Sequence, residues 1–132
     1  MIEVRPATEA DNGLLALLLE AARSESARYR GHIDPDNRPH TAVVACVVGE
    51  VVGVLFFRDD DSIRTISVVH VDESARNVGV GDALVGFVLR NASESGCTHI
   101  RSTALPGDRA TKNLFERNGM VARAIQVERN LT

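Results

Sequence analysis

The sequence contains no apolar run that approaches the roughly 20 residues needed to cross a bilayer. Its first residues, Met1 to Pro6, lack the apolar core of a secretory signal, so we expect a cytoplasmic protein. It has only two cysteines, Cys46 and Cys97, and each lies in a strand-like run. Two cysteines without close pairing are typical of reduced thiols in a cytosolic protein. A catalytic thiol that meets a histidine in space is the alternative.

Excess positive charge is also missing, because the net charge is −3. We therefore expect neither nucleic acid nor a membrane as a partner. The length of 132 residues, with 44% hydrophobic and 25% charged residues, predicts one globular domain over residues 1–132. Asp59, Asp60 and Asp61 are adjacent carboxylates, but no second cluster has the spacing of a calcium site. We interpret them as a charged hairpin loop and expect no metal.

The segment from Val68 to Leu84 runs from β-branched residues through a polar turn into an amphipathic pattern, which predicts a strand, a loop and a helix start. A helix start leaves backbone N–H groups unpaired and carries the positive end of the helix dipole, so it can hold a phosphate. Gly79 and Gly81 remove side chains that would keep a phosphate from those amides. Arg76 adds a cation at the mouth of the loop. The segment is therefore interpreted as a cradle for pyrophosphate.

The loop also has three simpler or more familiar interpretations. Two glycines before a helix are often only a turn. A Walker loop needs Lys-Ser or Lys-Thr after its last glycine, where this sequence has Asp82-Ala83. A dinucleotide-binding loop needs a third small residue at the position of Leu84. Neither of the two familiar phosphate-binding loops fits.

The order of the remaining patterns predicts a mixed α+β sandwich with helices on both faces of one sheet. A capping box at Thr8 and Asp11 begins a helix that fades near Arg28. Residues 29–40 are expected to form a loop in which His32 and His40 are solvated, with contact to a substrate as the alternative. Its predicted core stripe is Leu14, Leu15, Leu18 and Leu19 with Ala21 and Ala22. Strands are expected at 2–5, 41–48, 51–57, 63–71, 98–105 and 123–131, with a turn at Gly49-Glu50. Two more helices are expected, one from about 79 to 91 and one from 108 to 118, which Asp108 is well placed to cap.

The pattern Arg-x-x-Gly-x-Gly at 76–81 and a second motif at 108–120 lie in an order and at a spacing that resemble the GNAT superfamily of acetyl-CoA-dependent N-acetyltransferases. The resemblance covers nearly the whole chain. It implies an α-β-α sandwich with a mostly antiparallel sheet that splays between its fourth and fifth strands, and a pantetheine arm in that gap. The coenzyme contacts that it implies are Val69, Val71, Arg76, Asn77, Val78, Gly79, Val80, Gly81, Asp82, Ala83, Asp108 and Phe115.

The resemblance also implies transfer of an acetyl group from acetyl-CoA to a primary amine by direct attack on the thioester. In such enzymes the backbone amide at the position of Val71 stabilises the oxyanion. His70 is the candidate general base, because it titrates in the right range; the alternative is a packed core histidine. Asp61, Glu73 and His99 are weaker candidates. Phe115 stands where relatives have a tyrosine that protonates the leaving thiolate, and a phenyl ring cannot donate a proton.

Two alternatives to an enzyme follow from these departures. One is a non-catalytic acetyl-CoA sensor, suggested by Phe115. The other is a structural subunit whose final strand pairs with a second copy to form a homodimer. The acceptor, a small molecule or a peptide amine, cannot be identified from the sequence, although the acidic balance favours cationic amines.

Overall fold

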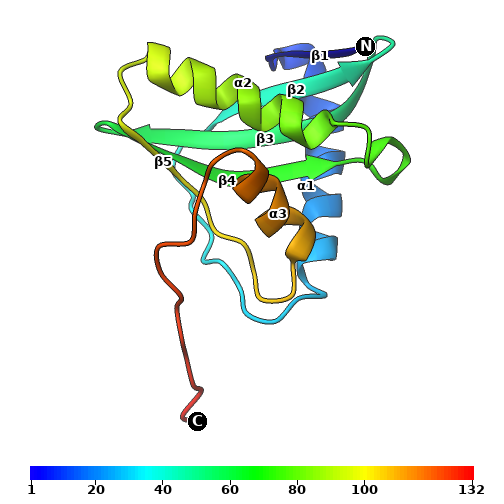
Figure 1. Ribbon diagram of the computed structural model, residues 1–132. Coiled ribbons are helices and arrows are strands. Elements are labelled where there is room, and N and C mark those ends of the chain that lie inside the picture. Colours follow the sequence, from blue (N-terminus) through cyan, green and yellow to red (C-terminus); the bar gives the residue numbers. More distant parts are fainter.

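The computed structural model describes residues 1–132, which form one five-stranded sheet and three α-helices (Figure 1). The strands lie in the order of the chain: β1 (Ile2–Pro6), β2 (Thr41–Val47), β3 (Glu50–Asp60), β4 (Ile63–Val71) and β5 (His99–Arg101). The helices are α1 (Asn12–Ser26), α2 (Val80–Glu94) and α3 (Arg109–Arg117), with short 3-10 turns η1 (Glu9–Asp11) and η2 (Glu73–Ala75). Neighbouring strands from β1 to β4 are antiparallel and β5 is parallel to β4, which confirms the predicted mostly antiparallel sheet.

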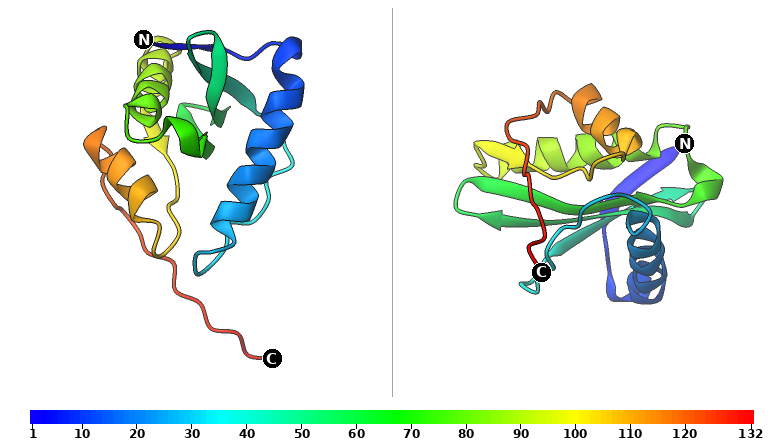
Figure 2. Two further views of the ribbon diagram at one scale, coloured as in Figure 1. Left: turned by 90° about the vertical axis from the view of Figure 1, so that its right-hand side faces the viewer. Right: turned by 90° about the horizontal axis from the view of Figure 1, so that it is seen from below.

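Helices cover both faces of the sheet, with α1 on one face and α2 and α3 on the other (Figure 2). The alternation of β2 explains the two cores that result. Val43 and Ala45 belong to the core under α2 and α3, whereas Val44 and Cys46 belong to the core under α1. The continuous apolar runs of β2 and β3 therefore serve two buried faces, as predicted.

Helix α1 buries fewer leucines than its periodicity predicts. Leu18 is buried and Leu15 packs against the same core, but Leu14 is 47% exposed and Ala21 is also exposed. The prediction for these two residues was wrong, because contact with the sheet is limited to a narrow stripe through Leu15 and Leu18. The start of the helix is as expected: the Asp11 carboxylate accepts from the Thr8 amide at 2.7 Å and from both terminal nitrogens of Arg5. These bonds lower the pKa of Asp11.

Two predicted turns lie elsewhere. The hairpin between β2 and β3 turns at Val48 and Gly49, which both have positive φ, because Val47 pairs with Glu50. Strand β3 then continues to Asp60, so Asp59 and Asp60 belong to a strand rather than to a hairpin loop. Asp59 pairs with Arg64 and Asp60 with Arg58. The carboxylates are thus held by arginines of the same hairpin.

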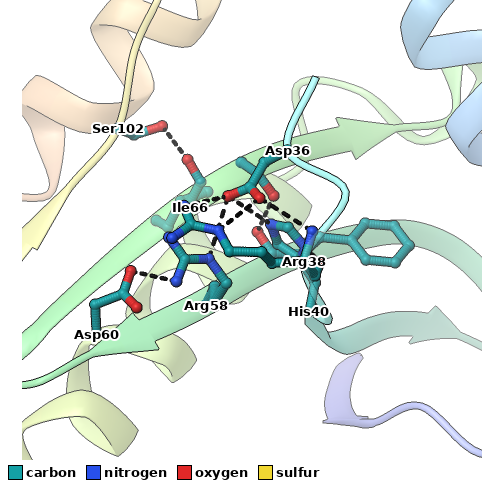
Figure 3. Close-up of polar contacts among 9 residues, drawn as sticks. Asp36, Arg38, His40, Arg58, Asp60, Ile66 and Ser102 are labelled. Carbon is teal, nitrogen blue, oxygen red and sulfur yellow. Dashed lines mark hydrogen bonds and ion pairs between the residues drawn. The ribbon is translucent and has the colours of Figure 1, made fainter. Parts of the chain in front are cut away.

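Strand β5 is shorter than expected because it leaves its neighbour. It pairs with β4 only at residues 63–65, and the Ser102 hydroxyl then donates to the Ile66 carbonyl at 2.8 Å (Figure 3). Beyond this bond β4 continues to Val71 without a partner on that edge. This is the predicted splay between the fourth and fifth strands.

The predicted final strand at 123–131 does not form. α3 ends at Arg117, and after Gly119 the chain leaves the body and extends away from it (Figures 1 and 2). The segment has a strand-like sequence, and Ile125 and Val127 are both 87% exposed. It has no neighbouring strand in the same copy, which a strand requires. Pairing with a second copy stays a hypothesis.

The loop that joins α1 to β2 is fastened to β3 by a charged cluster (Figure 3). The Asp36 carboxylate accepts from the Arg38 side chain at 2.9 Å and from Arg58 at 3.2 Å. His40 contacts the Arg38 carbonyl through Nδ1 at 2.7 Å. His40 is thus largely covered rather than solvated as predicted, whereas the side chain of His32 is 66% exposed. The loop is fixed at its end near the sheet.

Candidate active site

A cleft opens where β4 ends and α2 begins, between the loop that joins them and α3. Its lining includes ten of the predicted site residues, namely Val69, His70, Val71, Arg76, Asn77, Gly79, Val80, Gly81, Asp82 and Asp108. Six further lining residues escaped prediction: Glu25, Ala75, Ala110, Thr111, Leu114 and Arg117. Most of these residues come from α3. The periodicity of the second motif predicts a helix with distinct faces, but it does not show which face lines the cleft.

Three of the predicted residues do not line the cleft. Val78 is 64% exposed and Ala83 lies in the first turn of α2, outside the lining. Phe115 is buried in the core beneath α2 and α3. The phenyl ring, at the position where the resemblance implies a proton-donating tyrosine, is therefore packed in the core and does not line the cleft. Among the weaker base candidates, Glu73 borders an adjacent cavity. Asp61 and His99 lie at the opposite end of β4.

The start of α2 presents free amides to the cleft. Gly79 precedes the helix with a φ of 93°, which favours glycine, and its carbonyl accepts the first bond from the Ala83 amide at 3.0 Å. The amide of Ala83 is therefore used within the helix, contrary to the predicted role in the cradle. The amides of Val80, Gly81 and Asp82 have no acceptor in the helix. They form an electropositive patch.

Gly81 also has a packing role that the sequence did not reveal. A Cβ atom at this position would lie 3.3 Å from a methyl carbon of Leu114 in α3. The missing side chain therefore allows α3 to approach the first turn of α2. Asp82, in the same turn, binds Arg117 at 3.2 Å and Asn118 at 3.0 Å, which ties the two helices further.

The Arg76 side chain turns inward, away from the mouth of the loop where it was predicted. Its Nε donates to the Val71 carbonyl at 2.9 Å, and its Nη2 donates to the Glu25 carboxylate of α1 at 2.6 Å. Both side chains are about one third exposed, at 33% and 32%. The guanidinium is thus already paired with a carboxylate that comes from another layer of the fold.

The free edge of β4 faces the gap left by β5. The Asp72 amide donates to the Val52 carbonyl of the neighbouring chain segment at 2.8 Å. Successive amides of a strand point to opposite edges, so the amide of Val71 points away from β3 and into the gap. The amide of Val69 points the same way. Two backbone donors therefore face the space beside the cleft.

His70 is positioned between two cavities. It lines the cleft and also a second cavity bounded by Ser24 of α1, by Arg28 just after that helix, and by Asp72 and Glu73. The residue is 8% exposed, yet no protein group binds its ring nitrogens and neither nitrogen is sealed from solvent. Burial lowers the pKa of His70, while the negative charge of Glu25 opposes that shift. The imidazole is therefore neutral at pH 7.

The sequence matches the family described as Acetyltransferase (GNAT) family over residues 12–120. The chain belongs to the GNAT acetyltransferase family. This family uses acetyl-CoA, and the match spans both the loop before α2 and the second motif. No group of three or more His, Cys, Asp or Glu side chains in this GNAT protein is placed to hold a metal ion. None of its helices has the length and apolar character of a membrane span.

Solved structures share the fold of this GNAT protein. A transcriptional regulator from Bacillus halodurans C-125 is 24% identical, with 99% of this chain and 100% of that chain covered and a TM-score of 0.76. A ribosomal-protein-alanine N-acetyltransferase from Brucella melitensis biovar Abortus 2308 is 18% identical, with coverage of 100% and 99% and a TM-score of 0.75. AAC(6')-Iy in complex with a bisubstrate analog, CoA-S-monomethyl-acetylneamine, is 17% identical, with coverage of 98% and 99% and a TM-score of 0.73. No curated protein sequence matches the chain.

Proposed function

We propose that this GNAT protein transfers the acetyl group of acetyl-CoA to a primary amine by direct attack of the amine nitrogen on the thioester carbonyl carbon. The position of His70 carries the proposal. Its neutral ring is reached both from the cleft beside α2 and from the cavity beside α1. A base that touches both spaces can take a proton from an amine in one of them while a thioester lies in the other.

The coenzyme end of the site is built from backbone groups. The free amides of Val80, Gly81 and Asp82 are suited to the diphosphate, because they combine hydrogen-bond donors with the positive end of the α2 dipole. The amides of Val69 and Val71 face the gap between β4 and β5, which suits the amide groups of a pantetheine arm. The Val71 amide is then the donor for the oxygen that becomes negative as the amine attacks.

The transfer balances without a protein acid. The nitrogen lone pair forms the new C–N bond, the carbonyl re-forms and the C–S bond breaks, and the proton of the amine passes to His70. Coenzyme A leaves as a thiolate, and a thiol pKa of about 8.5 makes this departure tolerable in water. Phe115, which is buried in the core, takes no part.

The second cavity supports a cationic acceptor. Its lining holds three carboxylates, those of Glu25, Asp72 and Glu73, against the two guanidinium groups of Arg28 and Arg76. The excess of negative charge concentrates ammonium ions. Amines that carry positive charge are therefore the substrate class that this cavity favours.

The proposal predicts binding and turnover that can be measured separately. Acetyl-CoA at about 100 times its dissociation constant stabilises the folded state by about 2.7 kcal/mol, so the melting temperature rises by several degrees. Thiol release over a panel of small primary amines then reports turnover. If acetyl-CoA binds but no amine causes thiol release, the sensor alternative is favoured. If millimolar acetyl-CoA leaves the melting temperature unchanged, both the enzyme and the sensor hypotheses are contradicted.

The role of the α2 amides can be tested at Gly81 with two side chains of equal size. A new side chain meets Leu114, so Gly81→Gln measures the cost of crowding alone. Gly81→Glu adds one negative charge close to the diphosphate, and we expect coenzyme A to bind on the order of 100-fold more weakly than to Gly81→Gln. Isothermal titration measures both variants. Equal affinities would place the diphosphate away from this turn.

A further inference from the structure

The pair formed by Glu25 and Arg76 is the wall that the two cavities share. Both residues line the cleft and the cavity beside α1, together with His70. Glu25 lies on α1, on one face of the sheet, and Arg76 lies in the loop that leads to α2 on the other face. Their 2.6 Å contact therefore joins the acceptor side to the coenzyme side.

The geometry points to a latch, which we propose on the basis of the function above: Glu25 holds the Arg76 guanidinium away from the coenzyme phosphates until a cationic group of the acceptor replaces it at Glu25. The guanidinium has two of its donors engaged, one by the Val71 carbonyl and one by Glu25. A phosphate that draws Arg76 toward the α2 amides must break the contact with Glu25. The coenzyme thus binds more weakly than the amides and a free arginine would allow.

Two features make this exchange feasible. The pair is one third exposed on each side, so water and ligands reach it and its rupture does not strand a charge in the core. The Arg76 loop makes no other side-chain bond to α1. Arg76 Nε donates to Val71 of β4 rather than to α1, so the exchange at Glu25 does not require that bond to break. The exchange then needs only a rotation of the planar guanidinium about its side-chain bonds.

The exchange couples the two substrates. A cation bound at Glu25 frees Arg76 for the phosphates, so each substrate raises the affinity for the other by the same factor. Glu25 is then a specificity residue, because a neutral acceptor cannot release the latch. The chemical class that the cavity selects is an amine that carries a positive charge.

The latch is tested by coenzyme A affinity in four proteins: wild type, Glu25→Gln, Arg76→Ala and the double variant. Removing any nearby carboxylate favours binding of an anionic ligand through the electric field alone. The test therefore compares the effect of Glu25→Gln in a protein with Arg76 and in a protein with Ala at position 76. We expect Glu25→Gln to tighten binding on the order of 10-fold when Arg76 is present, since one charged contact is gained. With Ala at position 76 the same change should have no more than about a twofold effect.

Glu73→Gln is the matched control, because Glu73 lines the same cavity and has no ion pair. It removes the same charge without freeing an arginine, so we expect no more than about a twofold change. If Glu25→Gln has the same effect in both backgrounds, Glu25 acts only through its field and the latch is wrong. If the wild-type protein does not bind coenzyme A, the proposed function itself is contradicted.

The release step has its own measurement. Coenzyme A is titrated into wild type in 100 mM n-butylammonium chloride and in 100 mM sodium chloride, with pH and ionic strength matched. We expect tighter binding in the amine salt for wild type and no difference for Glu25→Gln. Equal affinities in the two salts for wild type overturn the release of Arg76 by an acceptor cation.

Discussion

Replacing His70 with glutamine lowers the turnover number for amine acetylation by about 100-fold or more, because general-base catalysis contributes on the order of 10²–10⁴ in rate. Glutamine keeps a polar planar group of similar reach but cannot take a proton at neutral pH. Coenzyme A affinity should change by no more than about threefold, because the diphosphate is held at the start of α2 rather than by His70. Steady-state kinetics and isothermal titration on the same variant separate these two expectations.

The pH dependence gives a second signature of the same residue. Burial lowers the pKa of His70 below its ordinary value of 6.5, so the base is neutral at pH 7. Once the ionisation of the acceptor amine is divided out, kcat/KM should therefore be constant near neutrality and fall as the pH drops through the lowered pKa, where the ring becomes protonated. In His70→Gln this acidic limb of kcat/KM should disappear.

His99→Gln is the matched control for the histidine substitution. His99 pairs with Ile63 at the end of β4 opposite to the cleft and is exposed. The same chemical change there should leave both turnover and the acidic limb within about twofold of wild type. If His70→Gln behaves like His99→Gln, water rather than His70 accepts the amine proton.

The part of the site that could be predicted from the sequence is the part made by neighbours in the chain. β-branched residues, a polar turn, two glycines and an amphipathic pattern follow one another within 68–84, and the structure places β4, η2 and α2 there. The capping role of Asp108 was readable for the same reason, and its carboxylate accepts from the Thr111 amide at 3.1 Å. A capping side chain bonds amides only two or three positions further along the chain, so a short stretch of sequence is enough to predict it.

The rest of the site depends on contacts between distant residues. Glu25 and Arg76 are 51 positions apart, so no spacing in the sequence pairs them. An arginine near a phosphate loop is expected to face the phosphate, but the sequence does not show which hydrogen-bond acceptors its guanidinium binds in the folded protein. The final segment fails for a related reason: its alternation indicates a strand, but a strand also needs a neighbour, and β5 leaves the sheet after Arg101.

Replacing Asp59 with asparagine destabilises the fold by about 3 kcal/mol, because it strips the carboxylate from a buried guanidinium. The Arg64 side chain is 2% exposed and its Nε and Nη2 each lie 2.8 Å from the Asp59 carboxylate. Its Nη1 donates to the Val88 carbonyl and to Asn91 of α2, and its guanidinium carbon lies 3.9 Å from the centre of the Phe57 ring. The charge therefore stays buried when its partner is removed.

Replacing Arg64 instead of Asp59 separates the energetic contribution of the buried charge from that of side-chain packing. Arg64→Met removes the charge and keeps an unbranched chain against Phe57, while Asp59, at 35% exposure, stays hydrated. We expect its cost to be within about 1 kcal/mol, so the smaller chemical change at Asp59 is the more damaging one. Urea unfolding of both variants measures the order, and a larger loss for Arg64→Met would show that the arginine bonds themselves stabilise the hairpin against α2.

The pH dependence of unfolding supplies the sign of the interaction. Bonding to Arg64 lowers the pKa of Asp59 in the folded protein, so its contribution is complete above the unfolded value of about 3.9 and is lost as the pH falls through the lower folded value. The difference in unfolding free energy between wild type and Asp59→Asn should be constant from about pH 5 to 8 and shrink below about pH 4. A difference that grows in acid would mean that the carboxylate is unfavourable where it lies, and that α2 is held to the hairpin by the remaining bonds of Arg64 alone.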